Sequence, residues 1–515
     1  MARLHEPDLR GGRVRGRLIL ALMLAGCAPG QQAPRELAHP PAMLPLAGVG
    51  ISGYRLQAEL GKGLELSVIA DCDLLSASGH APGVVLHLDS RLRVTAASAP
   101  WYQPRSGHGD WVYVELPRPF AAGLPEKVHI EYSGKHVMEQ AEGNDDWITP
   151  ADWYPTGTGP PPRTAPHFQV QATVAEAKYR LAQAAIDGNR RAVALVLGED
   201  VVTERNFTLA DGKPLAMTVS APHKSDPLAM TPLAGSKALE LLNFLGARYG
   251  DYPQTNVTVT TGGALSDPPV PGLVTFSPLS FVEGGAPGPS DFAPAMEVAR
   301  QWWGAWTVAA TPADEWLITG LQQVSGLLYE DATNGPEATL ETVADWRQSP
   351  ATLRSAAGGY VLYSLRQIML DPRSPNPDAA FIAMMRDFTA RYGGQPVSDR
   401  EFQQVAEKHM TTAMDLDGNH TLGWFFRGFS LNMPEIHFHA TTAAPVKGVA
   451  QVSLSVDNPG HWRGLLPVYL FKDDQVWVRG LMPITHDHET MTVPAPFIPK
   501  FVAANRFGDV PVRVN

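Results

Sequence analysis

The distribution of apolar and polar residues divides the chain into three parts. Residues 46–223 contain short runs in which apolar and polar positions alternate, such as 64–69, 83–88 and 111–116, with Gly, Pro and Asp between them. Alternation with a period of two indicates strands that bury one face. These residues are therefore predicted to form an N-terminal β-sandwich-like domain.

The period becomes helical over residues 224–430. Residues 233–249 have the spacing of an amphipathic helix, and a second helix is expected to begin after Asp291. A third is expected after Thr311, because Asp314 three residues later completes a capping-box-like sequence. This part is predicted to be a mostly α domain.

The alternating pattern returns in residues 431–515, with apolar runs at 450–456 and 465–471. A small C-terminal β-sandwich is predicted there. Together the three patterns predict a multidomain α+β fold in which the mostly α domain separates two β domains. A chain of 515 residues, 44% of them hydrophobic, is long enough to build several cores.

The most informative stretch is MEVARQWWGAWTVAATPADEWLITG, from Met296 to Gly320. It resembles the signature of the M1 family of metallo-aminopeptidases, H-E-x-x-H-Q-W-W/F-G, followed after eleven residues by W-L-x-E-G. The positions that agree without a gap are Glu297, Gln301, Trp302, Trp303, Gly304, Trp316, Leu317 and Gly320. The resemblance implies an M1 architecture over residues 46–515, with residues 224–430 as the thermolysin-like peptidase domain.

The positions that hold zinc in that family are changed in this chain. Met296 and Arg300 stand where the motif has its two histidines, and Thr319 stands where it has the glutamate ligand. A catalytic zinc of this kind is held by two imidazoles one helical turn apart and by a carboxylate. A thioether is a poor zinc ligand, and a guanidinium has no lone pair to donate. We therefore expect no metal and no catalytic residue at this centre.

Glu297 matches the general base of the family, which acts on a metal-bound water. Two arrangements are open for it. In the first, Arg300 replaces the lost metal charge and pairs with Glu297, so that neither charge is buried alone. In the second, both side chains are solvated in a wet cleft.

Two further elements of the family's substrate site are changed. Counting back from Gly272, Pro269 takes the position of the glutamate that holds the substrate amino group in the G-A-M-E-N motif, and Val270 takes that of the asparagine. Ser355 replaces the tyrosine that stabilises the oxyanion. These departures favour the loss of peptidase activity and leave the substrate-binding residues unknown.

The first 26 residues are typical of a lipoprotein signal peptide. A basic segment precedes an apolar run at 18–25, which is too short to span a bilayer, and the sequence L-A-G-C that ends at Cys27 resembles a lipobox. Cleavage before Cys27 and lipidation of its thiol are expected, with residues 27–45 as a flexible tether. The protein is therefore predicted to be an exported lipoprotein. In a Gram-negative host it would be held at the outer membrane, facing the periplasm.

Charge limits the partners. The chain has 41 basic and 52 acidic residues, of which residues 1–26 contain five and two, so 36 and 50 remain, a net charge of −14. Such a chain repels nucleic acid, and no nucleic-acid partner is expected. Contact with a membrane is expected through the lipid anchor alone.

Three functions are compatible with these patterns. The first is a lipid-anchored, M1 peptidase-like protein that is catalytically inactive, needs no cofactor and binds an unknown protein or peptide ligand at the cell envelope. The second is an active M1-type zinc metallopeptidase that uses non-standard ligands. The third is a structural scaffold of the envelope. Zinc is a cofactor under the second alternative only.

Overall fold

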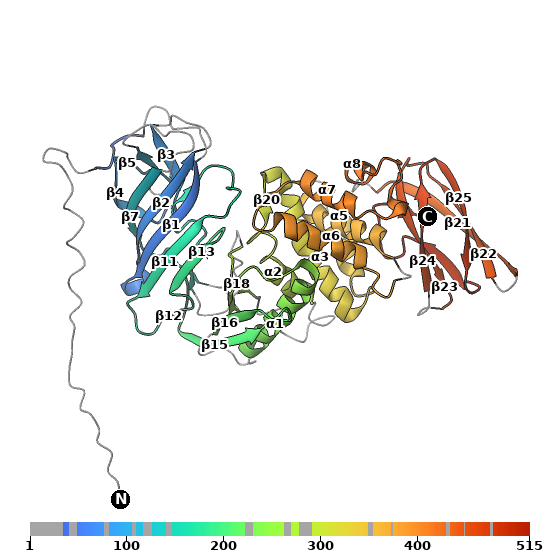
Figure 1. Ribbon diagram of the computed structural model, residues 1–515, viewed down its shortest axis with the longest axis horizontal. Helices are drawn as coiled ribbons and strands as arrows, with labels where there is room; N and C mark the ends of the chain where they lie inside the picture. Colours follow the sequence, from blue (N-terminus) through green and yellow to red (C-terminus); the bar gives the residue numbers. More distant parts are fainter. Residues whose placement is uncertain are drawn as a thin grey trace, which may run out of the picture.

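The computed structural model describes residues 34–40, 49–76, 82–105, 110–116, 126–140, 147–221, 230–261, 269–277, 291–348, 354–371, 374–428, 433–446, 449–473 and 477–515. A β-rich N-terminal part, a central helical part and a C-terminal β part follow one another along the long axis of the molecule (Figure 1). The predicted multidomain α+β fold is confirmed. Over these ranges no helix is both long and apolar enough to cross a bilayer.

The N-terminal part is built on three sheets that share one apolar core. The six-stranded sheet consists of β13 (Ala185–Asn189), β11 (His167–Val174), β1 (Val49–Leu60), β2 (Leu66–Ser76), β7 (Glu126–Gly134) and β4 (Arg93–Ala97), in that order. The second has β10 (Thr156–Gly157), β3 (Gly83–His87), β6 (Trp111–Glu115) and β5 (Trp101–Tyr102), and the third β12 (Arg180–Leu181), β14 (Val196–Gly198), β9 (Trp147–Ile148) and β8 (Glu139–Gln140). Buried and exposed positions alternate along β11, as the period of two predicts.

A four-stranded sheet opens the central part, in the order β15 (Asp200–Thr208), β16 (Pro214–Ala221), β17 (Asn256–Thr260) and β18 (Leu273–Thr275). The predicted boundary at residue 223 assigned β15 and β16 to the N-terminal domain. In the structure β16 runs parallel to β17, and Leu215 and Met217 belong to the same core as the helix α1 (Met230–Tyr249). The sheet therefore crosses the predicted boundary, and the domain boundaries stay predictions.

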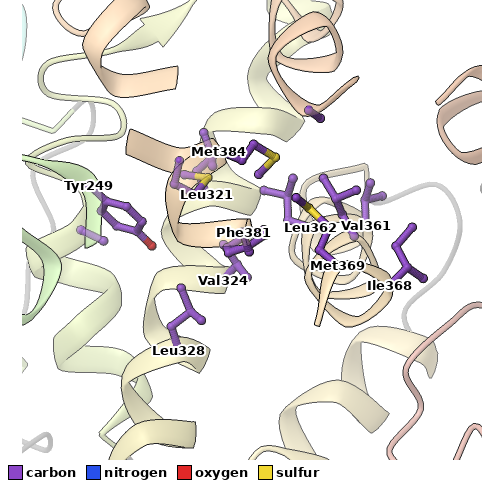
Figure 2. Packing of buried hydrophobic residues seen from close by; sticks show 14 of the residues in the cluster. Tyr249, Leu321, Val324, Leu328, Val361, Leu362, Ile368, Met369, Phe381 and Met384 are labelled. Atoms are coloured by element: carbon purple, nitrogen blue, oxygen red, sulfur yellow. The ribbon is translucent and has the colours of Figure 1, made fainter. Parts of the chain in front are cut away.

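The helices of the central part pack side by side. They are α2 (Phe292–Ala299), α3 (Glu315–Asn334), α4 (Leu340–Gln348), α5 (Arg354–Met369), α6 (Ala379–Tyr392), α7 (Asp399–Lys408) and α8 (Gly423–Gly428), with the short strands β19 (Val308–Ala309) and β20 (Pro396–Val397) paired beside them. Figure 2 shows Leu321 and Val324 of α3 close to Phe381 and Met384 of α6. This core supports α2, which lies against α3 and carries the candidate site.

The C-terminal part has two sheets. One has the order β25 (His488–Ala495), β22 (Val449–Asp457), β21 (Glu435–Val446) and β27 (Arg513–Val514), and the other β24 (Trp477–Ile484), β23 (Gly464–Phe471) and β26 (Phe501–Ala504). Their buried side chains, such as Ile436 and Leu465, join the core that contains Ile368 of α5 and Trp424 of α8. The C-terminal sheets are therefore packed as an extension of the helical core.

The helices α3 and α5 approach closely where two glycines meet. A Cβ atom on Gly320 would lie 2.6 Å from the carbonyl carbon of Gly358, a distance that no real Cβ contact tolerates. The glycine of the W-L-x-E-G motif is therefore kept by packing, whatever happens to the neighbouring metal ligand. Gly320→Ala should lower the free energy of unfolding by roughly 1–3 kcal/mol, because the backbone of α5 cannot move aside cheaply.

Gly246 supplies the matched control for this prediction. It lies in α1, and a Cβ atom there would meet nothing within 4 Å. Gly246→Ala should be neutral or stabilising by up to about 1 kcal/mol, since alanine favours the helix. Denaturant unfolding of both variants tests the contact, and equal stabilities would contradict it.

Candidate functional site

The candidate site lies where α2 ends and α3 begins. Met296 and Glu297 are on the last turns of α2, Arg300 is its C-terminal cap, and Thr319 is on the second turn of α3. All four side chains are partly buried. The structure therefore brings the positions of the metal-binding motif together on two packed helices, as the register of the sequence predicts.

A tight turn ends α2 and fixes the position of Arg300. The N–H of Ala305 donates to the carbonyl of Arg300 at 2.9 Å, and Gly304 has a φ of +108°. A Cβ on Gly304 would lie 2.9 Å from Cγ of Pro269 and 3.0 Å from Nε2 of Gln322. Both the positive φ and the close contacts require glycine here, which explains why this residue of the motif is retained.

Gln301 joins α2 to the segment before β18. Its side chain is 2% exposed. Its Oε1 accepts hydrogen bonds from the N–H of Gly272 at 2.7 Å and from the hydroxyl of Tyr252 at 3.3 Å. Its Nε2 donates to the carbonyl oxygens of Val270 at 3.2 Å and Leu273 at 2.6 Å. The oxygen of this buried amide accepts two hydrogen bonds and its nitrogen donates two, and together they hold the end of α2 in one position.

The tryptophans after Gln301 complete this anchor. Trp302 and Trp303 are fully buried, and Nε1 of Trp302 donates to the carbonyl of Gly250 at 3.3 Å. The ring of Trp303 packs against Tyr249 and Phe388, with centroids 5.2 Å and 5.9 Å away. These retained residues of the motif therefore build the core and do not line a ligand site.

Glu297 and Arg300 form an ion pair at the centre of the site. Nη1 of Arg300 lies 3.8 Å from Oε2 of Glu297, and the two side chains are 13% and 11% exposed. Of the two arrangements open from the sequence, the buried pair is the one found. Burial nevertheless raises the pKa of Glu297 to about 7, although the positive charge of Arg300 lowers it.

The residues at this centre do not fit a zinc ion. The donor positions carry a thioether at Met296, a guanidinium at Arg300 and a hydroxyl at Thr319. The first is a soft, neutral donor, the second is a cation without a lone pair, and a neutral hydroxyl is a weak substitute for a carboxylate. Nowhere in the described ranges do three His, Cys, Asp or Glu side chains gather as a metal site would require.

The other predicted site residues are placed as follows. Pro269 and Val270 are buried, and Val270 packs with Ile148 and Val196 of the N-terminal part, so neither offers a carboxylate for an amino group. Ser355 is in the first turn of α5, but its side chain lies outside what the structure describes. Cys27 also lies outside the described residues.

Neither a family model nor a curated protein matches this sequence. Several solved structures are similar to it in fold. A variant of the M1 zinc metallopeptidase from Deinococcus radiodurans, bound to a Tyr-Ser-Ala substrate, is 19% identical with a TM-score of 0.54, over 73% of this chain and 94% of that one. Legionella pneumophila aminopeptidase A in complex with aspartic acid is 11% identical with a TM-score of 0.62, over 91% and 59%.

Leukotriene A4 hydrolase from Saccharomyces cerevisiae is also similar, at 10% identity and a TM-score of 0.51, over 72% of this chain and 67% of that one. All three likenesses are below the identity at which activity can be inferred, and they show the fold alone. The M1 architecture implied by the sequence motif is confirmed at that level.

Glu297→Gln should change how stability depends on pH. With a pKa raised from 4.5 to about 7, the folded protein still holds this proton where the unfolded chain has released it. The contribution of Glu297 to stability is thus complete below about pH 4.5 and falls as the pH rises towards 7, by about 3 kcal/mol in total. The amide of the variant does not titrate, so its stability relative to the wild type should rise between pH 5 and pH 8, as measured by thermal unfolding.

Arg300→Ala tests the same pair from its other side. Loss of the cation leaves the carboxylate of Glu297 unpaired, so the variant should lose about 1 kcal/mol more at pH 8 than at pH 5, where the carboxyl group is protonated. Adding Glu297→Gln should recover most of the loss at pH 8. Strictly additive effects that do not vary with pH would contradict the pairing.

Proposed function

We propose that this protein is a lipid-anchored, M1 peptidase-like protein that does not hydrolyse peptides and acts in binding at the cell envelope. The observation that carries the proposal is the ion pair between Glu297, at the general-base position of the family motif, and Arg300, at the position of its second histidine. A general base without a metal-bound water has nothing to activate. The centre is thereby converted from a catalytic to a structural element.

The positive charge of Arg300 supports the proposal that this centre binds no zinc. A single positive charge about 4 Å from a divalent cation is repelled by roughly 8 kcal/mol at an effective dielectric constant near 20. Arg300 is largely buried, so solvent screens this repulsion weakly. Arg300 therefore opposes the ion in addition to supplying no ligand, and we propose that no cofactor is needed.

The rest of the substrate site supports the same conclusion. The position that would hold the substrate amino group is the buried Pro269, whose ring lies against Gly304. A proline has neither a carboxylate nor a backbone N–H with which to hold a peptide. Peptide hydrolysis would therefore lack its anchor for the substrate as well as its metal. A protein or peptide ligand remains the proposed partner.

Repair of the metal site tests this function. Met296→His, Arg300→His and Thr319→Glu together should take up about one zinc ion per chain, because α2 and α3 already hold these positions in the register of a zinc site. Hydrolysis of aminoacyl substrates should stay very low in the repaired protein, since Pro269 is unchanged. Elemental analysis and a fluorogenic peptidase assay supply the two readouts.

The matched control keeps the cation. Met296→His with Thr319→Glu, in a chain that retains Arg300, should not bind zinc tightly, because the positive charge remains beside the ion. Peptidase activity of the unchanged protein that is lost with a chelator and restored by zinc would overturn the proposal and favour an active enzyme with non-standard ligands.

The membrane anchor is a separate part of the proposal and rests on the lipobox-like sequence at Cys27. The wild-type protein should incorporate labelled fatty acid and sediment with membranes when it is expressed in a bacterium that processes lipoproteins. Cys27→Ser should remove the label. Cys72→Ser is the control, because that thiol is buried in the N-terminal core and should not affect lipidation. A wild-type protein without label would contradict the anchor.

A further inference from the structure

Arg190 is buried between the N-terminal part and the central sheet. It follows β13 and is 8% exposed. Its Nη1 donates to the carbonyl of Pro271, just before β18, at 2.8 Å, and its Nη2 donates to Oδ1 of Asn256, at the start of β17, at 3.1 Å. Both acceptors are neutral. Arg190 therefore ties the two parts together through neutral acceptors.

Among the described residues two other arginines, Arg366 and Arg479, are buried to a similar degree, and Arg366 shows what a counter-charge does. Arg366 of α5 is held by the carboxylates of Asp331 and Asp378, at 2.5 Å and 2.7 Å, and these raise its pKa. No acidic side chain of the described residues forms an ion pair with Arg190. Burial lowers the pKa of Arg190, although the neighbouring Tyr252 raises it in part. A buried charge in this state is unfavourable unless something else compensates it.

A small cavity lies beside Arg190. Its wall includes Gln183 and Thr258, which are polar, and Val196, Val270 and Gly272. The space open to the centre of a water-sized sphere is about 20 Å³. A cavity needs roughly 10–15 Å³ on this measure to hold one water molecule. The space therefore fits a single small occupant and excludes an organic ligand.

We propose that this cavity binds one small inorganic anion, of the halide class, which pairs with Arg190. Water could fill the space but brings no negative charge to the guanidinium. An anion balances that charge in surroundings where a Coulomb interaction is weakly screened. The site lies outside the candidate centre at α2, and it does not depend on the function proposed for that centre.

The anion would also strengthen the contact between the N-terminal part and the central sheet. Arg190 reaches Pro271, and Gly272 beside it donates to Gln301 of the α2 anchor. A bound halide fixes the guanidinium on the segment that also positions α2. The contact between the N-terminal part and the central sheet should then become stronger as halide is added, which is opposite to the usual effect of salt on exposed ion pairs.

Crystals of the full chain grown in sodium bromide give the most direct test. An anomalous difference peak within hydrogen-bonding distance of the Arg190 guanidinium is the expected result, because bromide scatters anomalously and water does not. This measurement uses the unchanged protein and does not require any variant to fold. Water alone in the cavity at a saturating bromide concentration would overturn the proposal.

A solution experiment with a matched control complements the crystals. Replacing gluconate by chloride at constant ionic strength should raise the midpoint of thermal unfolding of the wild type by about 2–4 °C, and Arg190→Gln should abolish this shift. Arg191→Gln is the control. Arg191 also donates to carbonyl oxygens, those of Arg163 and Gly394, but it does not line the cavity. A chloride shift that persists in Arg190→Gln, or that disappears equally in both variants, would contradict an anion at Arg190.

Discussion

The architecture around the candidate site depends on the buried side chain of Gln301. Hydrogen bonds from both ends of this amide fasten the end of α2 to Tyr252 and to the segment that leads into β18. Each bond is modest, but removal of the amide would take a hydrogen-bond partner from the buried N–H of Gly272 and from the carbonyl of Leu273, at about 1–3 kcal/mol for each group left unpaired. The two tryptophans that follow fill the core behind it. The position of α2 is therefore fixed by Gln301, Trp302 and Trp303, which are not at the metal-ligand positions of the motif.

This separation explains how the motif can lose its ligands and keep its shape. Gln301, Gly304 and Gly320 are each required by packing or hydrogen bonding in this structure. Met296, Arg300 and Thr319 lie at the metal-binding positions of the motif, on or at the end of α2 and on α3. Substitution of the ligands therefore changes the chemistry of the site without changing the path of the chain.

Two opposing effects act on the ion pair of Glu297 and Arg300: burial disfavours the charged carboxylate, and the guanidinium attracts it. Arg300 attracts the carboxylate of Glu297 from 3.8 Å, yet the pKa of Glu297 still rises to about 7. Desolvation is therefore the larger effect, and the carboxyl group is partly protonated at neutral pH. The pair prevents a bare charge in the core but adds little net stability, as expected for buried ion pairs in general.

Much of this could be predicted from the sequence. The spacing of apolar residues, with a period of two in the β parts and of 3.6 in the helical part, predicted the three parts of the chain. The positions of Trp302, Trp303 and Trp316 in the motif predicted the M1 architecture. The pairing of β16 with β17, which crosses the predicted boundary at 223, could not be foreseen, because it joins residues far apart in the chain and leaves no local signal. The cavity at Arg190 could not be foreseen for the same reason, since its wall comes from segments about 80 residues apart.

The central claim is that an ion pair has replaced the metal. Equilibrium dialysis of the unchanged protein against micromolar zinc at pH 7, followed by elemental analysis, tests it most directly. Arg300 and the missing imidazoles predict far less than one zinc ion per chain, with no change when Glu297 is replaced by Gln. One tightly bound zinc per chain, lost on replacement of Glu297 or Met296, would contradict the claim.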